Sequence, residues 1–89
     1  MRPWRVVVVV VRYFAGARAA AGLASEEVDV SDGATVADVL EAIATRHGEA
    51  LRGVLGACSF LLDSVAVRDR GTPLRPGAEL EVLPPFAGG

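Results

Sequence analysis

The most strongly apolar stretch lies near the N terminus, where six consecutive valines occupy positions 6 to 11. β-branched side chains favour extended backbone, so the run predicts a strand over residues 4–12. The run is apolar at every position rather than at every second one, which indicates that both faces of this strand are covered. We therefore expect it at the centre of a sheet, because on an exposed edge it would promote aggregation.

Two further elements follow the valine run. Residues 13–22 are rich in alanine and end in Gly22, which predicts a short helix that stops at this glycine. Residues 26–30 alternate loosely and place Val28 and Val30 on one face. This alternation predicts a second strand, which pairs with the first through a long hairpin.

The clearest helical pattern lies in the middle of the chain. Residues 31–33, Ser-Asp-Gly, predict a turn. Thr35 is then suited to cap a helix, with Asp38 three residues later as the acidic partner of a capping box, and Gly48 is suited to close it. Apolar residues recur at helical spacing between these ends and predict one buried stripe. The stripe consists of Val36, Val39, Leu40, Ile43 and Ala44.

The last part of the chain divides into short pieces. In order, we expect a helical turn or loop over 51–57, strands over 59–62 and 64–68 with a bend at 63–64, turns at 69–71 and 76–77, and a final strand over 79–83. The final strand alternates cleanly, with Leu80 inward, joined by Ala78 and Val82, and with Glu79 and Glu81 outward.

This order of elements predicts the fold class. A hairpin, one helix of three to four turns and further strands indicate an α+β architecture, with the helix packed across a mixed sheet. The first and last strands are the most apolar, so we expect them side by side at the centre of the sheet, which is the arrangement of a β-grasp. With 89 residues the chain is expected to form one such domain over residues 1–83, followed by an extended tail over residues 84–89.

Composition narrows the classes of function. The chain is 52% hydrophobic and 22% charged with a net charge of −2, which suits a globular domain and gives no electrostatic case for nucleic acid. All nine basic residues are arginine, so the chain offers no ε-amine for attachment of its own C terminus. A single cysteine suits a reducing compartment, and the valine run is too short for a membrane span or a signal peptide. We expect a cytoplasmic protein with no membrane partner.

The sequence contains few candidates for catalysis inside the domain. It shows no metal-ligand spacing, no glycine-rich phosphate loop and no serine–histidine–acid set, so we expect neither a metal nor a bound cofactor. Cys58 stands among apolar residues and is interpreted as a packing residue. Arg46 and His47 are interpreted as helix-end residues whose positive charge suits the helix dipole. Arg12 and Arg18 are first interpreted as surface charges.

The C-terminal tail has the most distinctive composition. Pro84 and Pro85 favour an extended path and remove two backbone donors, so sheet pairing should stop there. Phe86 offers one apolar anchor, with packing back onto the domain as the alternative. Gly88 and Gly89 let another surface approach closely. Fully extended, residues 84–89 reach roughly 20 Å. We expect the carboxylate of Gly89 to be the working group that the rest of the tail presents.

Four segments carry a resemblance to a known family. The family is that of the MoaD/ThiS-like, ubiquitin-related sulfur carriers, and the chain is most similar to the small subunits of molybdopterin synthase. The segments are Val-Arg-Tyr-Phe-Ala at 11–15 followed by Arg18 and Gly22, Gly-Ala-Thr-Val-Ala-Asp-Val-Leu at 33–40, residues 72–80, and Leu-Pro-Pro-Phe-Ala-Gly-Gly at 83–89. The last is the most specific. The chain departs from the family at 61–64, where Leu-Leu-Asp-Ser replaces a shorter strand with an Asn-Gly turn.

The resemblance implies a chemistry for the tail. In this family an E1-like activating enzyme uses ATP to adenylate the terminal glycine, and a sulfur donor protein then converts the acyl-adenylate to a thiocarboxylate. The large subunit of the synthase accepts the tail and uses its sulfur to build the molybdopterin dithiolene. Such a chain is not catalytic alone but is the sulfur-donating subunit of the complex.

The family pattern also assigns residues. Gly88 and Gly89 match its terminal pair, where a side chain would block a narrow channel. For contacts with the partner we expect Phe86, Pro85, Ala87, Phe14 and Arg18.

Three other functions fit the same pattern. The chain could be a sulfur carrier for thiamine or cysteine biosynthesis, in which a different acceptor takes the sulfur. It could be a ubiquitin-like modifier that forms isopeptide bonds with other proteins. It could also be a β-grasp binding module whose tail is inert.

Overall fold

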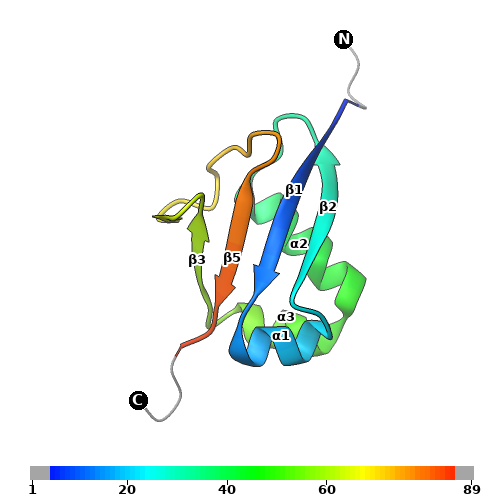
Figure 1. The fold of residues 1–89 in the computed structure, drawn as a ribbon, viewed down its shortest axis with the longest axis vertical. Helices are drawn as coiled ribbons and strands as arrows, with labels where there is room; N and C mark the ends of the chain where they lie inside the picture. Colours follow the sequence, from blue (N-terminus) through cyan, green and yellow to red (C-terminus); the bar gives the residue numbers. More distant parts are fainter. Residues whose placement is uncertain (1–4, 86–89) are drawn as a thin grey trace.

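A computed structural model of the chain describes residues 5–85, and residues 1–4 and 86–89 lie outside the description. Within this range a five-stranded sheet is accompanied by three helices (Figure 1). The strands are β1 (Val6–Tyr13), β2 (Ser25–Ser31), β3 (Ser59–Leu62), β4 (Val65–Ala66) and β5 (Glu79–Leu83). The helices are α1 (Ala15–Ala21), α2 (Val36–His47) and α3 (Glu49–Leu55).

The sheet order is β2-β1-β5-β3-β4, so the first and last strands lie side by side in its interior. β1 and β5 run parallel, with Val11 opposite Leu80, whereas β1 pairs with β2 and β5 pairs with β3 in the antiparallel sense. The sheet is therefore mixed, and α2 lies across one face of it (Figure 1). The predicted α+β architecture with a β-grasp arrangement is confirmed.

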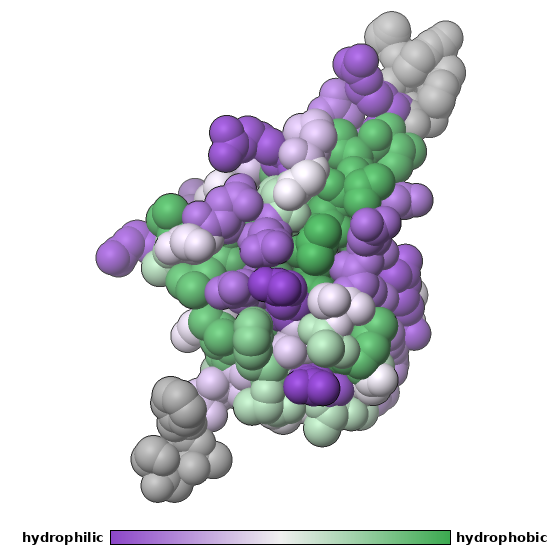
Figure 2. All heavy atoms as spheres, in the orientation of Figure 1, coloured by the Kyte–Doolittle hydropathy of each residue, from purple (hydrophilic) through white to green (hydrophobic). Residues whose placement is uncertain are grey.

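β1 is a central strand, but the prediction that both of its faces are covered is wrong. Val7, Val9, Val11 and Tyr13 are buried, whereas Val6 and Val8 on the other face are 56% and 39% exposed. The helices α2 and α3 cover only one face, behind the sheet in Figure 1, and Figure 2 shows hydrophobic surface along the opposite, open face. Valine favours an extended backbone whether or not its side chain is buried. The unbroken run of valines therefore predicted the strand but not which of its faces is buried.

The central helix begins and ends as the sequence predicts. The hydroxyl of Thr35 accepts a bond from the Asp38 N–H, and the Asp38 carboxylate accepts one from the Thr35 N–H. All five residues of the predicted stripe are buried against the sheet. The helix ends at His47 and the Gly48 N–H donates to the carbonyl of Ala44. These contacts fix α2 at both ends and along its length.

The other two helices are shorter. α1 follows the alanine-rich pattern and ends at Gly22, whose φ of 84° lies in the left-handed region that glycine tolerates. Of the stretch predicted as a helical turn or loop over 51–57, residues 51–55 are helical and belong to α3, which begins two residues earlier at Glu49 and ends at Leu55. Leu51 and Leu55, four residues apart, are both buried, which outweighs the low helix propensity of glycine inside this segment.

The segment that departs from the family forms a tight hairpin. Leu62 pairs with Val65, so Asp63 and Ser64 make a two-residue turn, and both have positive φ, of 49° and 72°. The bend at this point is confirmed, but the strand predicted over 64–68 is limited to Val65–Ala66. The Asp63 N–H donates to the Glu79 carbonyl, and the Asp63 carboxylate accepts from the Glu79 N–H, which ties the turn to β5.

Replacing Ser64 by glycine is expected to stabilise the domain. A residue with a Cβ pays a conformational cost in the left-handed region, and glycine does not, although glycine loses more entropy on folding. We expect Ser64→Gly to raise the free energy of unfolding by about 0.5–1 kcal/mol in denaturant titrations. Ser59→Gly, in the neighbouring strand β3, is the control and should lower it. A lower stability of Ser64→Gly would contradict the expectation.

Candidate functional site

The candidate site is the end of the molecule where β5 leaves the sheet. β5 ends at Leu83, Pro84 is partly buried and Pro85 is exposed. Because β5 is hydrogen-bonded to β1 on one side and β3 on the other, the base of the tail is held in a fixed direction. The four tail residues that the sequence singles out, Phe86, Ala87, Gly88 and Gly89, lie outside the described residues.

Phe14 lies beside the last residues of β5. Its N–H donates to the carbonyl of Val82 at 3.3 Å, and the residue remains 40% exposed. The next residue, Ala15, has a φ of 49°, a left-handed conformation that turns the chain sharply from β1 into α1. A large aromatic side chain is thereby left on the surface next to the point where the tail begins.

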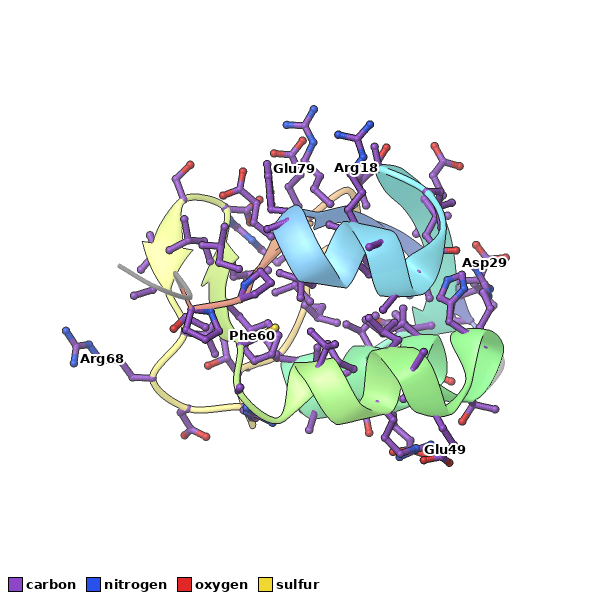
Figure 3. The ribbon with its side chains drawn as sticks, turned by 90° about the horizontal axis from the view of Figure 1, so that it is seen from below. Arg18, Asp29, Glu49, Phe60, Arg68 and Glu79 are labelled. Atoms are coloured by element: carbon purple, nitrogen blue, oxygen red, sulfur yellow. The ribbon has the colours of Figure 1, made fainter. Side chains whose placement is uncertain are left out.

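Arg18 is placed by the first turn of α1. Its N–H donates to the Phe14 carbonyl at 3.3 Å, and its side chain is exposed. Figure 3 shows Arg18 and Glu79 pointing to the same side of the molecule, away from α2 and α3. We name Phe14, Arg18 and Pro85 the tail-base surface. It combines an aromatic ring, a positive charge and a proline at one end of the sheet, a combination suited to contact with another protein.

A cluster of polar side chains joins the ends of β1, β2 and α2. The carboxylate of Glu26 on β2 accepts hydrogen bonds from the Tyr13 hydroxyl and from Arg46 Nη1, the latter at 2.9 Å, and contacts His47 Nε2. The Glu26 side chain is only 10% exposed. The rings of Tyr13 and His47 meet edge to face, with centroids 5.9 Å apart. One carboxylate thus ties the end of β1, just before Phe14, to the end of α2.

The cluster shifts the ionisation of two of its members. Burial alone would raise the pKa of Glu26, but the hydrogen bonds from Tyr13, His47 and Arg46 together hold it below its ordinary value. Burial, and then the bond to the Glu26 carboxylate, raise the pKa of the Tyr13 hydroxyl. Glu26 is therefore held as a carboxylate and Tyr13 as a neutral donor.

Sequence patterns do not predict this cluster, because Arg46 and His47 fit the end of a helix and Glu26 stands in an ordinary strand pattern. A signal was present, because Glu26 shares its strand face with Val28 and Val30, both of which are buried. A charged residue on the inward face of a strand requires partners, and such partners can be sought at the end of the helix that packs on that face.

The remaining candidates fit their first interpretation. Cys58 is buried, its thiol donates to the Val54 carbonyl at 3.3 Å, and burial raises its pKa, which suits packing rather than nucleophilic attack. Arg12 is exposed and lies 3.9 Å from the carboxylate of Glu79.

Residues 5–85 contain no group of three or more side chains able to hold a metal ion. No helix in the same range is long and apolar enough to cross a bilayer.

Comparisons with known proteins agree on one family. A family model described as the ThiS family matches residues 11–89. The molybdopterin synthase sulfur carrier subunit of Chlamydomonas reinhardtii is 36% identical to this chain over 80 residues, which make up 89% of this chain and 95% of that protein.

Solved structures show the same likeness. The crystal structure of SAMP1 from Haloferax volcanii is similar with a TM-score of 0.82 and 31% identity, covering 92% of this chain and 99% of that one. One chain in the complex of subunits 1 and 2 of the molybdopterin-converting factor from Helicobacter pylori is similar with a TM-score of 0.63 and 29% identity, covering 93% of this chain and all of that one. The likeness therefore extends over nearly the whole domain.

Proposed function

Because this chain belongs to the ThiS family, we propose that it is a sulfur carrier and acts as the small, sulfur-donating subunit of a molybdopterin synthase. The resemblance to ubiquitin-related sulfur carriers is confirmed by the family match. The molybdopterin branch is supported above all by the Chlamydomonas relative, which is itself a molybdopterin synthase sulfur carrier subunit. The geometry of the tail base supports the same function, since a central strand delivers the tail beside an exposed aromatic ring.

The chemistry would take place at Gly89. A carboxylate is a poor electrophile, so an E1-like enzyme would join it to the AMP part of ATP and release pyrophosphate. A persulfide on the sulfur donor protein would then attack the acyl carbon and displace AMP, and a thiol reductant would cleave the S–S bond of the resulting acyl disulfide to release the thiocarboxylate. The carrier would hold no cofactor of its own, and ATP would be a substrate of the activating enzyme.

The tail-base surface would serve the partners. The large subunit of the synthase must hold the tail while the thiocarboxylate sulfur attacks the pterin precursor, and a complex of two subunits is known for the Helicobacter pylori factor. Phe14 adjoins the end of β5, and Arg18 follows it in the first turn of α1. We propose that they contact the large subunit together with Pro85, Phe86 and Ala87, while Gly88 and Gly89 enter its active site.

A second function has one observation in its favour. The likeness to SAMP1, a small archaeal modifier protein in other solved structures, suits a carrier that is also attached to proteins. Carriers for thiamine or cysteine biosynthesis would form the same thiocarboxylate but would give its sulfur to another acceptor.

Reconstitution distinguishes these functions. The thiocarboxylated chain is mixed with the large subunit of a molybdopterin synthase and the pterin precursor, and dithiolene formation is measured. We expect dithiolene with the full chain and none with a chain that lacks Gly88 and Gly89. Sulfur transfer only to a thiamine or cysteine acceptor, or a ladder of conjugates on a denaturing gel without dithiolene, would reject the proposal.

A further inference from the structure

The strand β2 forms one edge of the sheet, and its backbone has an open side. The Tyr13 N–H donates to the Ala24 carbonyl, and the Asp32 N–H donates to the Arg5 carbonyl, both at 2.8 Å. These bonds mark the two ends of the β1–β2 ladder, and antiparallel bonds recur at every second residue. The even-numbered residues of β2 therefore bond to β1, and Glu27, Asp29 and Ser31 turn their backbone groups away from the sheet.

Part of this open side is already occupied. Arg46 Nη1 reaches the Glu27 carbonyl at 3.5 Å, and the Ser31 carbonyl accepts from the Ala34 N–H at 2.9 Å. Within residues 5–85, no protein group pairs with the N–H and carbonyl of Asp29 or with the N–H of Ser31. The middle and the end of β2 therefore offer the donors and the acceptor that an additional strand requires.

The same edge is negatively charged. The side chains of Glu27 and Asp29 are exposed and form no ion pair within the described part of the chain. Figure 3 shows Asp29 at the side of the molecule, on β2. A hollow of about 600 Å³ adjoins the end of β2 and is lined by Asp29, Asp32 and Asp38 among others. Asp32 is paired with Arg5 and Asp38 caps α2, so Asp29 is the carboxylate left for an incoming cation.

We propose that an extended segment of a partner protein, in which arginine or lysine recurs at every second position, adds to β2 as a further strand at Asp29 and Ser31. Backbone bonds would supply affinity and the alternating side chains would supply specificity. The residue opposite Asp29 would place its side chain about 5 Å away on the same face, where a cation suits the carboxylate.

Charge selects this occupant over a second copy of the chain. Two β2 edges pairing with each other would bring Glu27 and Asp29 of both copies together across the new ladder. Like charges directly opposite one another destabilise a strand pair. An acidic edge therefore resists self-pairing and favours a basic partner.

The open edge of β2 is separate from the tail-base surface. Asp29 lies opposite Val8 on β1, whereas Val82, near the end of β5, lies opposite Tyr13. Five residues along a strand span roughly 17 Å. A partner on the β2 edge could therefore remain bound while an enzyme holds the tail. The inference stands on β2 alone and does not depend on the proposed function.

A capped peptide in which valine alternates with arginine tests the inference. It is titrated into the full-length chain, and amide shifts and hydrogen exchange are followed by NMR. We expect slower exchange at Asp29 and Ser31 and saturable shifts along β2. A matched peptide in which glutamate replaces arginine should not bind. Shifts confined to the helices, or an absence of binding by the arginine peptide, would overturn the proposal.

Charge-reversal variants distinguish specific binding at the β2 edge from nonspecific electrostatic attraction. Asp29→Lys should lower the affinity of the chain for the arginine peptide roughly tenfold. Glu49→Lys makes the same change in net charge at a 93% exposed side chain on α3 and should leave the affinity unchanged. Equal losses in both variants would overturn the proposal. Concentration-dependent dimerisation that Asp29→Lys alters would assign the edge to a second copy, and binding only after removal of residues 1–4 would assign it to the chain's own N terminus.

Discussion

One residue added after Gly89 should abolish sulfur loading and leave the fold unchanged. Under the proposed function, the activating enzyme joins AMP to a terminal carboxylate on an unbranched, glycine-only tip, so an added alanine moves the carboxylate and introduces a side chain. The fold and stability of the domain should not change. Leu80 and Val82 anchor β5 in the core and are fully buried, and the strand is paired on both sides before the tail begins.

Intact-mass spectrometry measures the effect. Each chain is incubated with the activating enzyme, ATP and the sulfur donor. The unmodified chain should gain the mass of one sulfur-for-oxygen exchange, and the extended chain should keep its mass. An alanine added before Met1 is the matched control and should be loaded normally. Thermal unfolding should be the same for all three chains. Loading of the extended chain to the same degree would show that Gly89 is not the acylated residue.

The elements that the sequence predicts well are those whose local signals agree with one another. In α2 the cap at Thr35, the apolar stripe and the closing Gly48 all indicate the same helix, and the structure has it at those bounds. β5 alternates cleanly because one of its faces packs on the helices. The run of valines is less informative, because strand propensity and burial favour the same residues, and only the arrangement of the helices shows which face is covered.

The candidate site likewise has one part that the sequence predicts and another that it does not. The tail can be recognised from sequence because its chemistry is that of the backbone, and prolines and glycines restrict or free the backbone wherever they stand. The position of Phe14 beside β5 depends on the parallel pairing of two strands that are about 70 residues apart, a topology that local patterns alone do not establish. The Glu26 cluster depends on three segments meeting, and no single segment reports it.

The Glu26 cluster leads to the second large effect. Glu26→Ala should lower the free energy of unfolding by roughly 2–3 kcal/mol, because it leaves the Tyr13 hydroxyl buried without its acceptor and removes the bonds from Arg46 and His47. Glu27→Ala, at the next residue and exposed, should change it by less than about 0.5 kcal/mol. Urea titrations near neutral pH measure both changes.

A double-mutant cycle identifies the cause. Tyr13→Phe removes the donor, so the two changes together should cost less than the sum of the single changes. Strict additivity would mean that the bond between Tyr13 and Glu26 contributes nothing. Because Tyr13 precedes Phe14, the same variants should also weaken binding to the large subunit, even at temperatures where they remain folded.

The pH dependence gives an independent test with a definite sign. The pKa of Glu26 is lower in the folded chain than in the unfolded chain, so the unfolded chain takes up a proton first as the pH falls. The stabilisation from the carboxylate is complete above the unfolded value of about 4.3 and is lost as the pH falls through the folded value. Glu26→Gln cannot ionise, so the stability difference between the wild type and this variant should shrink below about pH 4. A difference that stays constant to lower pH would mean that the charge of Glu26 does not hold β1, β2 and α2 together.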